Sequence, residues 1–455
     1  MPETILRSMT SQAGRLRTIT VNGLFGRFDY EITLEPDDPT VITGLNGTGK
    51  STILRMVDAV SRGDLPALID FPVESFQLTF DGIEPVIFDR DANARVARIS
   101  WGDLSHLQDI TWNLELASLP TWAIEAVREH PDGTDELVES LRRHAGPMSF
   151  VEFSEGRELA LSLWRRRSDL VTPDWFTGIR EAFPVLFITD QRLVAEPGAR
   201  REPHRGRPRL GARPIRVGQR TIERASRDIA SRIQDADSRY ARVSQRQDRT
   251  FPNHVIAAMK RGKKMSAQSV GKLSREVDVQ RERLRLVGLL DGADAFGLHL
   301  DPSDLEDPNV RSVVATIFES DLQKLSVLNG LAERLAAFKA FLDRRYAPKS
   351  VQLSRQGGIR ILTPNGGEIR PSELSSGEQQ MAVLAYEILF RAEDATVVII
   401  DEPEISLHVL WQDTLIEDLA TMGGPSGLQF LMATHSPTIL ANHQHLERSL
   451  DLLAR

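Results

Sequence analysis

Apolar and polar positions follow different periods in different parts of the chain, and this divides the sequence into zones. Residues 17–115 alternate apolar and polar side chains in short runs, which is typical of half-buried β-strands. Residues 116–186 mix helical and strand patterns. Short strand patterns return after residue 349, where residues 396–400 form an almost wholly apolar run, as in a strand covered on both faces. The pattern therefore predicts an α/β fold with strands in both end zones.

Two stretches between these zones space their apolar residues by three and four positions, as on one face of a helix. One runs from Ile222 to Val243 and the other from Leu328 to Phe338. We expect them to pair as an antiparallel arm of roughly 40 Å, the length of about 25–30 helical residues. Residues 196–217, rich in Pro, Gly and Arg, predict a loop before the first helix.

Composition narrows the possible chemistry. The 455 residues are enough for two or three domains, and none of them is cysteine, which excludes disulfides, zinc–thiolate sites and thiol catalysis. No apolar run approaches the roughly 18 residues of a membrane span, and the N-terminus has no signal-peptide core. We therefore expect a cytoplasmic protein that makes no use of a membrane.

The net charge of −8 argues against a general affinity for nucleic acid, but this charge is unevenly distributed. Residues 192–285 contain 25 Lys and Arg against 10 Asp and Glu, a net charge of +15. Such an excess can mark a surface that binds an anion, or it can belong to solvated, Arg-rich helices. Both interpretations remain open at the level of the sequence.

Residues 44–51, GLNGTGKS, match the P-loop pattern, between a β-branched run and a helical pattern. The glycines allow successive N–H groups to point at phosphate oxygens. We expect Lys50 to bridge the β- and γ-phosphates of ATP and the Ser51 hydroxyl to bind Mg²⁺. The predicted nucleotide-binding residues of this segment are Asn46, Gly47, Thr48, Gly49, Lys50, Ser51 and Thr52.

Residues 397–402, VVIIDE, form an apolar strand that ends in two acids, the Walker B arrangement. Asp401 is placed to hold Mg²⁺ through a water molecule, and Glu402 is placed to polarise an attacking water. Residues 374–380, LSSGEQQ, form a Ser/Gly-rich turn that opens a helix and offers N–H groups and a hydroxyl to an anion. Taken alone, that turn is equally an ordinary helix N-cap.

These segments resemble, in their order, the motifs of ABC-type ATPases, with residues 374–380 as the signature motif. Residues 431–437, LMATHSP, complete the resemblance, which implies that His435 contacts the γ-phosphate. Residues 401–408, DEPEISLH, match the local form of OLD/RecF-like and SMC-like ATPases, with residues 406–408 as the D-loop. The family packs its heads head to tail, so the resemblance implies a dimer or higher oligomer in which Ser375, Ser376 and Gly377 act on the partner's nucleotide.

The resemblance implies an α/β fold: an ABC-type P-loop head, with a mixed β lobe and a parallel-sheet core, interrupted by a helical, coiled-coil-like insertion. The predicted parts are residues 1–195, 196–348 and 349–455. Gln191 is the candidate Q-loop residue that senses nucleotide and Mg²⁺, and Arg192 competes for that role. An aromatic residue near the adenine, Phe25 or Phe28, is a further candidate.

The spacing of the motifs separates this chain from transporter ATPases, whose signature follows the P-loop by roughly a hundred residues. Here Leu374 lies 323 residues after Ser51, and the insertion is far shorter than the arms of SMC proteins. The chain instead resembles AAA15/AAA21-type phage-defence ATPases related to the OLD family. Since it ends 20 residues after His435, we expect no fused nuclease and an effector on a separate protein.

Three functional hypotheses remain. The first is an ATP-driven sensor that controls a separate nuclease or toxin, as in the PARIS system, which looks closest in layout, or in Septu. DNA, or an acidic phage protein that mimics DNA, would then bind the basic insertion. The second is a RecF/SMC-like, DNA-associated ATPase of repair or maintenance. In the third, ATP stabilises the interface of a scaffold and is hydrolysed slowly or never.

Overall fold

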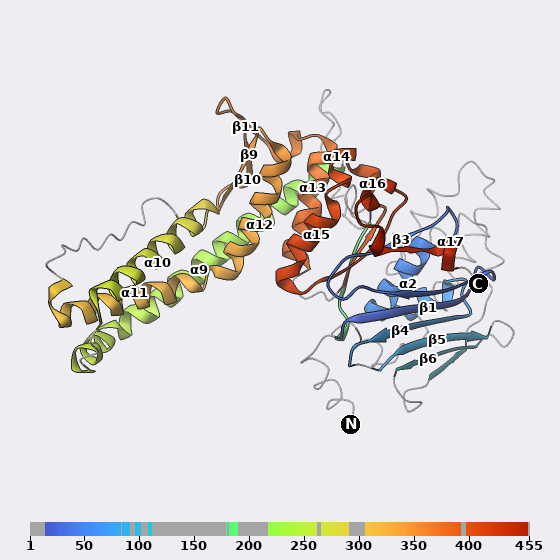
Figure 1. The fold of residues 1–455 in the computed structure, drawn as a ribbon, viewed down its shortest axis with the longest axis horizontal. Helices are drawn as coiled ribbons and strands as arrows, with labels where there is room; N and C mark the ends of the chain where they lie inside the picture. The colour runs from blue at the N-terminus through green and yellow to red at the C-terminus, as the bar shows by residue number, and fades with distance from the viewer. Residues whose placement is uncertain are drawn as a thin grey trace, which may run out of the picture. The chain divides into compact units, whose positions relative to one another are not determined.

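The computed structural model describes residues 14–82, 84–91, 96–101, 108–111, 179, 182–189, 217–261, 265–290, 305–392 and 397–453. The chain forms two compact units, each built from segments that are distant in sequence. The first, here called the head unit, contains residues 1–192, 196–202 and 391–455. The second, here called the helical unit, contains residues 193–195 and 203–390. Figure 1 shows the two units as ribbons.

The head unit is centred on a five-stranded sheet in which every paired strand is parallel. Its strands, in spatial order, are β14 (Glu447–Ser449), β3 (Thr40–Thr43), β13 (Gln429–Ala433), β12 (Val397–Asp401) and β8 (Val185–Ile188). All residues of β12 and β13 are buried, which is the condition that their continuous apolar sequences predict. The carboxyl ends of these strands lie at one edge of the sheet, where α/β proteins form their sites.

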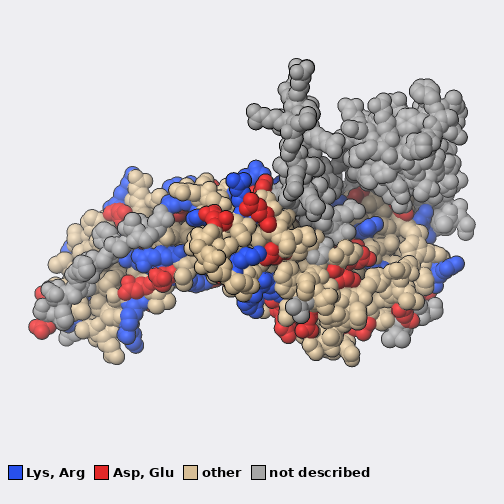
Figure 2. All heavy atoms as spheres, turned by 90° about the horizontal axis from the view of Figure 1, so that it is seen from above, with Lys and Arg blue, Asp and Glu red and all other residues tan. Residues whose placement is uncertain are grey.

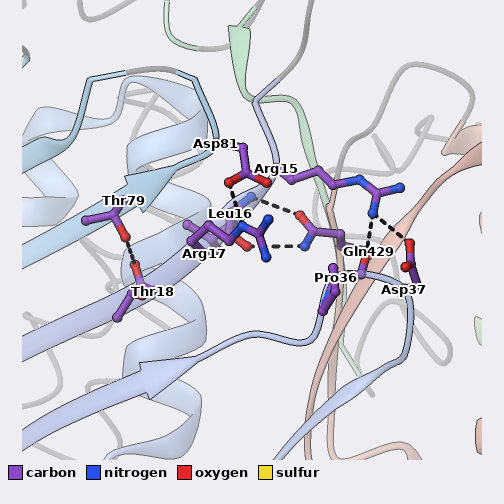
Figure 3. A network of polar contacts seen from close by, with 9 residues as sticks. All are labelled: Arg15, Leu16, Arg17, Thr18, Pro36, Asp37, Thr79, Asp81 and Gln429. Atoms are coloured by element: carbon purple, nitrogen blue, oxygen red, sulfur yellow. Dashed lines mark hydrogen bonds and ion pairs between the residues drawn. The ribbon is translucent and has the colours of Figure 1, made fainter.

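A second, antiparallel sheet completes the β-structure described in the head unit. In spatial order its strands are β2 (Phe28–Thr33), β1 (Leu16–Leu24), β4 (Ser75–Phe80), β5 (Val86–Asp91), β6 (Val96–Trp101) and β7 (Gln108–Thr111). The side chain of Gln429 on β13 joins the two sheets, as Figure 3 shows. Its amide accepts a hydrogen bond from the Leu16 N–H at 2.9 Å and donates one to the Leu16 carbonyl at 3.2 Å. A buried amide that satisfies both backbone groups fixes β1 relative to the parallel sheet.

Helix α2 (Lys50–Arg62) follows β3 and buries its apolar face in the core of the head unit. Ile53 and Val57 of this helix belong to one buried cluster with Ile19 of β1 and Leu431 of β13. Full burial of each such side chain contributes about 1.5–3 kcal/mol, so this cluster holds α2 against both sheets. The other described α-helices of this unit are α3 (Leu65–Asp70), α14 (Val409–Gln412), α15 (Leu415–Gly423), α16 (Pro437–Leu440) and α17 (Leu450–Leu453).

The helical unit is dominated by α9 (Val217–Arg261), whose 45 residues extend about 68 Å at 1.5 Å per residue. Ser320 of α11 is hydrogen-bonded to Gln247 of α9, and His254, further along α9, lines one pocket with Ser312, further back along α11, so the two helices run antiparallel. The unit also contains α10 (Ala267–Leu286), α11 (Pro308–Ser326), α12 (Asn329–Tyr346), β9 (Ser350–Ser354), β10 (Gly358–Leu362), β11 (Glu368–Ile369), α13 (Ser376–Tyr386) and the π-helical turn Glu387–Arg391, which spans its border. None of the described helices is long and apolar enough to cross a membrane.

The α/β fold class is confirmed, but the helix pairing expected from periodicity differs. The predicted apolar face of the first stretch is buried at Ile222, Ile229 and Ile233. The distal part of α9 packs on α11, however, whereas α12, which carries the second stretch, packs on β9 and α13. Residues 349–390 consequently fold with the helical unit. The predicted boundary at residue 349 separates the insertion from the segment that carries the signature, Walker B and His435 motifs. It stays a prediction about functional parts of the chain.

Candidate functional site

The P-loop joins β3 to α2 at the carboxyl edge of the parallel sheet. Gly47 and Gly49 have φ angles of +84° and +100°, which residues with a Cβ rarely adopt. A Cβ at Gly49 would lie 2.4 Å from the Leu24 side chain, whereas a Cβ at Gly47 would meet nothing within 4 Å. The loop is therefore packed on its inner side at Gly49 and open on its outer side at Gly47. The Tyr30 hydroxyl holds it from β2 by donating to the Thr48 carbonyl at 3.0 Å.

Lys50, the first residue of α2, is buried and donates hydrogen bonds to the carbonyls of Gly44 at 2.8 Å and Leu45 at 3.1 Å. Burial lowers the pKa of its amine, and the charges of Glu402, Asp451, Asp401 and Glu404 oppose that shift in this order. The amine is thus enclosed by the loop and lies within the field of several carboxylates.

Ser51 and Asp401 bring the P-loop and β12 together. The Ser51 hydroxyl donates a hydrogen bond to Asp401 Oδ1 at 2.9 Å, and Asp401 is buried at the end of its strand. A hydroxyl and a carboxylate are hard oxygen ligands, the kind that Mg²⁺ prefers. This pair is therefore suited to one Mg²⁺ next to the loop.

Glu402 follows Asp401 in a left-handed backbone conformation, with φ +51° and ψ +54°. This conformation is costly for a residue with a Cβ, and residues held in it are enriched at functional sites. Glu402 Oε1 lies 3.9 Å from Nε2 of His435, and both side chains are about one-third exposed. The predicted catalytic pair therefore lies at the same sheet edge as Lys50 and Asp401, because β12 and β13 are parallel neighbours.

A pocket of about 1020 Å³ lies against the outer side of the P-loop. Its aromatic wall contains both residues that the sequence suggests for the adenine, Phe25 and Phe28, together with Tyr30. Asp451 of α17 lines the same pocket, and its carboxylate accepts a hydrogen bond from the Leu45 N–H at 3.2 Å. Sequence reasoning missed Asp451, since the only available signal was its position after a short strand near the end of the chain.

The predicted signature residues lie at the start of α13 in the helical unit. Ser375 is the N-cap: its hydroxyl accepts from the Glu378 N–H, and Glu378 Oε2 accepts from the Ser375 N–H at 2.9 Å, a capping box. Ser375 and Ser376 are exposed and Gly377 is half-buried. The N-cap interpretation of this turn is therefore realised, and an exposed helix N-terminus is also compatible with an anion.

The remaining predicted residues divide into two groups. Asn46 is exposed at the tip of the P-loop, and Thr52 is half-buried in the first turn of α2. Gln191 and its alternative Arg192 lie outside the described residues, so the Q-loop assignment stays a prediction.

One protein-family model matches the region of the chain that contains the residues of the site. The model of the family described as "AAA domain, putative AbiEii toxin, Type IV TA system" matches residues 40–441, from β3 through the His435 loop. The chain belongs to this family. The matched region contains the P-loop, the signature turn, the Walker B strand and the loop of His435.

Curated relatives match parts of this chain. A Brucella melitensis protein named "Putative peptide import ATP-binding protein" is 24% identical over 203 residues, which make up 42% of this chain and 57% of that protein. The chain thus spans little more than half the length of this relative. The Vibrio cholerae protein "Retron Vc95 probable ATPase" is 32% identical over 122 residues, covering 24% of this chain and 22% of that protein.

Solved structures that align with most of this chain include two SMC head domains. The head domain from Pyrococcus furiosus, with an extended coiled coil and bound to the C-terminal domain of ScpA, has 14% sequence identity and a TM-score of 0.35. That alignment covers 94% of this chain and 92% of the other. The head domain from Thermotoga maritima has 12% identity and a TM-score of 0.32, over 94% and 91% of the two chains.

Proposed function

We propose that this chain binds ATP with Mg²⁺, hydrolyses it at a slow or regulated rate, and serves as the sensor or scaffold subunit of a bacterial anti-phage defence system. In that role it controls a separate nuclease or toxin effector. One observation carries the proposal: Lys50, the Ser51–Asp401 pair and the Glu402–His435 pair meet at one edge of the parallel sheet.

The residues present fit ATP and Mg²⁺. The outer side of the P-loop is open at Gly47, a pocket with an aromatic wall adjoins it, and a buried amine stands at its base. Lys50 binds phosphate oxygens, and their negative charge favours the protonated amine that burial alone disfavours. Ser51 and Asp401 hold Mg²⁺, with Gln191 as a further proposed contact. Phe25 or Phe28 stacks on the base.

For hydrolysis, the bound nucleotide supplies the phosphoanhydride bond, and Mg²⁺ neutralises charge on its oxygens. Glu402 accepts a proton from the attacking water, as a carboxylate within hydrogen-bond reach of that water does. His435, whose Nε2 lies 3.9 Å from Glu402, donates a hydrogen bond toward the γ-phosphate. The left-handed backbone of Glu402 supports this assignment, because such strain is concentrated where side-chain direction matters.

The active assembly is a head-to-tail dimer or a higher oligomer in this proposal. Ser375, Ser376 and Gly377 of one subunit contact the nucleotide held by the P-loop of another. The exposed N-terminus of α13 supports this contact, because its N–H groups and the Ser375 hydroxyl suit an anion.

Two of the comparisons support a defence role: the family description names a Type IV TA system, and one relative is a retron ATPase. A PARIS-type or Septu-type system, with a nuclease on a separate protein, is the finer form of the proposal. The relative named as a peptide import protein would instead favour a role in transport. The signature here follows Ser51 by more than 300 residues, however, which does not suit a transporter ATPase.

ATP hydrolysis by the purified chain tests the enzymatic part. Lys50→Ala should abolish ATP binding, while Glu402→Gln should keep binding and lower turnover by about 10²–10⁴-fold. Glu417→Gln, on the exposed face of α15, is the matched control and should behave as the wild type. If Glu402→Gln turned over ATP normally, Glu402 would lose its proposed role. Isolation of the chain with the product of its neighbouring gene, with and without ATP, tests for the effector.

The partner of the basic insertion is proposed to be a polyanion, DNA or an acidic DNA-mimic protein. Four exposed arginines of α9 at intervals of three and four residues, here called the arginine face, support it. They are Arg239, Arg242, Arg246 and Arg249. The face extends about 15 Å, and none of the four forms an ion pair within the part of the chain that the structure describes. Figure 2 shows both basic and acidic side chains on the surface of the helical unit.

Binding of a 30-base-pair duplex at several salt concentrations tests this partner. Each phosphate contact adds about 0.9 to the slope of log K against log salt, so changing all four arginines to Gln should flatten the slope by up to about 3–4. The double variant Arg242→Gln/Arg246→Gln is compared with Lys272→Gln/Arg275→Gln on α10, which should change little. Equal slopes in the quadruple variant and the wild type would remove DNA as the partner of this face.

A further inference from the structure

Two hydrogen bonds join the loop that follows Asp401 to the loop that follows β13. The Glu402 N–H donates to the Ala433 carbonyl at 2.9 Å, which continues the ladder between β12 and β13. Two residues further on, Glu404 Oε1 accepts a hydrogen bond from the His435 N–H at 2.5 Å. The short turn Pro403–Ser406 therefore holds the backbone of His435 by the side chain of its second residue.

A second connection, through Gln412, supports the first. Gln412 is buried, and its amide group donates to the carbonyls of Leu407 at 3.0 Å and Glu404 at 3.4 Å. Its carbonyl oxygen accepts from the Ser436 hydroxyl at 2.7 Å. The turn after Glu402 and the loop around His435 are thus connected on both sides of the His435 main chain, which limits how far these loops can separate.

Glu404 is an unusual choice for a purely structural hydrogen bond. Its second oxygen, Oε2, is buried and has no hydrogen-bond partner among the described residues. A buried acceptor without a partner costs folding free energy, so packing does not account for a glutamate at this position. The carboxylate also contributes to the electrostatic field at Lys50, which places its charge near the P-loop.

We propose that Glu404 is a positioning residue that sets the distance between the side chains of Glu402 and His435. It shares the turn with Glu402, and it holds His435 by the N–H of the residue whose ring lies 3.9 Å from Glu402. A hydrogen bond that fixes the main chain of His435 also fixes the origin of its side chain. This inference rests on the proposed function, since it assigns Glu404 to the same hydrolytic site.

Steady-state ATP hydrolysis with two Glu404 variants tests the role. Glu404→Gln keeps an oxygen that accepts the His435 N–H, whereas Glu404→Ala removes it. We expect Glu404→Ala to lower kcat about tenfold or more with KM for ATP within about threefold, and Glu404→Gln to restore kcat to within about threefold of wild type. Glu417→Ala is the control, because Glu417 lies 3.9 Å from the ring of His443 and is exposed. A normal kcat in Glu404→Ala, or equal loss in the Gln and Ala variants, would overturn the proposal.

A second measurement separates this proposal from the proposed function. Selective ¹⁵N labelling of the 10 histidines gives a small set of amide signals, of which the His435 signal is the one lost in His435→Gln. We expect this signal to move upfield in Glu404→Ala, to move little in Glu404→Gln and to stay in place in Glu417→Ala. A His435 signal that is the same in Glu404→Ala and wild type would show that the bond is absent. If the wild type shows no hydrolysis, the proposed function fails, while the amide signal still decides whether Glu404 holds His435.

Discussion

The hydroxyl of Ser51 donates a hydrogen bond of 2.9 Å to the carboxylate of Asp401, although the two residues are 350 positions apart. Parallel pairing explains the contact: β13 is the neighbour of both β3 and β12, so the segments that follow all three strands emerge at one edge. Ser51 lies near the start of the matched family region and Asp401 near its end, and each contributes one oxygen to the same site.

Removing either oxygen should weaken the response to Mg²⁺. We expect Ser51→Ala and Asp401→Asn to raise the Mg²⁺ concentration needed for half-maximal ATP binding by about tenfold or more, which is the scale on which loss of even an outer-shell partner weakens a metal site. Titration of Mg²⁺ against a fluorescent ATP analogue measures this. Arg55→Gln, on an exposed residue of the same helix, is the control for Ser51→Ala. Equal Mg²⁺ requirements in the wild type and both variants would exclude the pair as ligands.

The charge of Asp451 should oppose nucleotide binding. Its carboxylate bonds to the P-loop N–H of Leu45 and lines the adjoining pocket, so it repels phosphate groups. Asp451→Asn keeps an acceptor without the charge and should tighten ATP binding by up to about fivefold, the scale of one exposed ionic interaction. Calorimetry at low and high salt should show the gain shrinking as salt screens the charge. Asp413→Asn, on an exposed residue of the same unit, is the control and should leave the affinity for ATP unchanged. Weaker ATP binding by Asp451→Asn would contradict a repulsive role for Asp451.

Tyr30 should make stability sensitive to alkaline pH. Burial first, and the charge of Asp451 second, raise the pKa of Tyr30 from 10.0 to about 12. The folded protein therefore keeps a proton that the unfolded chain loses above pH 10, so this contribution is complete below pH 10 and disappears as pH rises through 12. Denaturant unfolding of the wild type and Tyr30→Phe between pH 9 and 12 measures the difference. The stability advantage of the wild type should fall over that window, and a constant difference would disprove the shift.

Ser375 should contribute to both helix stability and assembly. Its capping box with Glu378 at the start of α13 predicts that Ser375→Ala costs about 1 kcal/mol of unfolding free energy. The exposed neighbour Ser376 is not the N-cap, and Ser376→Ala should cost less than half as much. Chemical unfolding compares the two variants. The proposed head-to-tail dimer adds that Ser375→Ala reduces ATP-dependent dimerisation in light scattering; if Ser376→Ala were the more destabilising variant, the cap would not carry this role.

The motifs were predictable because their information is local. A P-loop requires glycines and a lysine within eight positions. Strand β12 is recognised from four consecutive apolar residues followed by an aspartate. The hydrogen bond of Glu404 to His435 is different, since the partners are 31 positions apart and no spacing rule connects them. The same holds for Gln429, whose partner Leu16 is 413 positions away.

The helix partners show a second limit of the sequence pattern. Periodicity identifies the buried face of a helix, and it does so for Ile229 and Ile233 of α9. It contains no information about which other helix covers that face. The pairing of α9 with α11 depends on contacts such as Lys324 with Asp248, which are set by the tertiary fold.

The strands on either side of the helical unit have a consequence for the architecture as a whole. β8 precedes this unit and β12 follows it, and the two are hydrogen-bonded parallel neighbours, with Val185 opposite Val397. The entire helical unit thus occupies the place of one crossover connection, which elsewhere needs only a dozen or so residues. The length of such a connection has a weak effect on the closure entropy of the sheet. The length of this unit can therefore change without altering the pairing of β8 with β12, and a designed protein with a shorter or longer arm should keep the same strands.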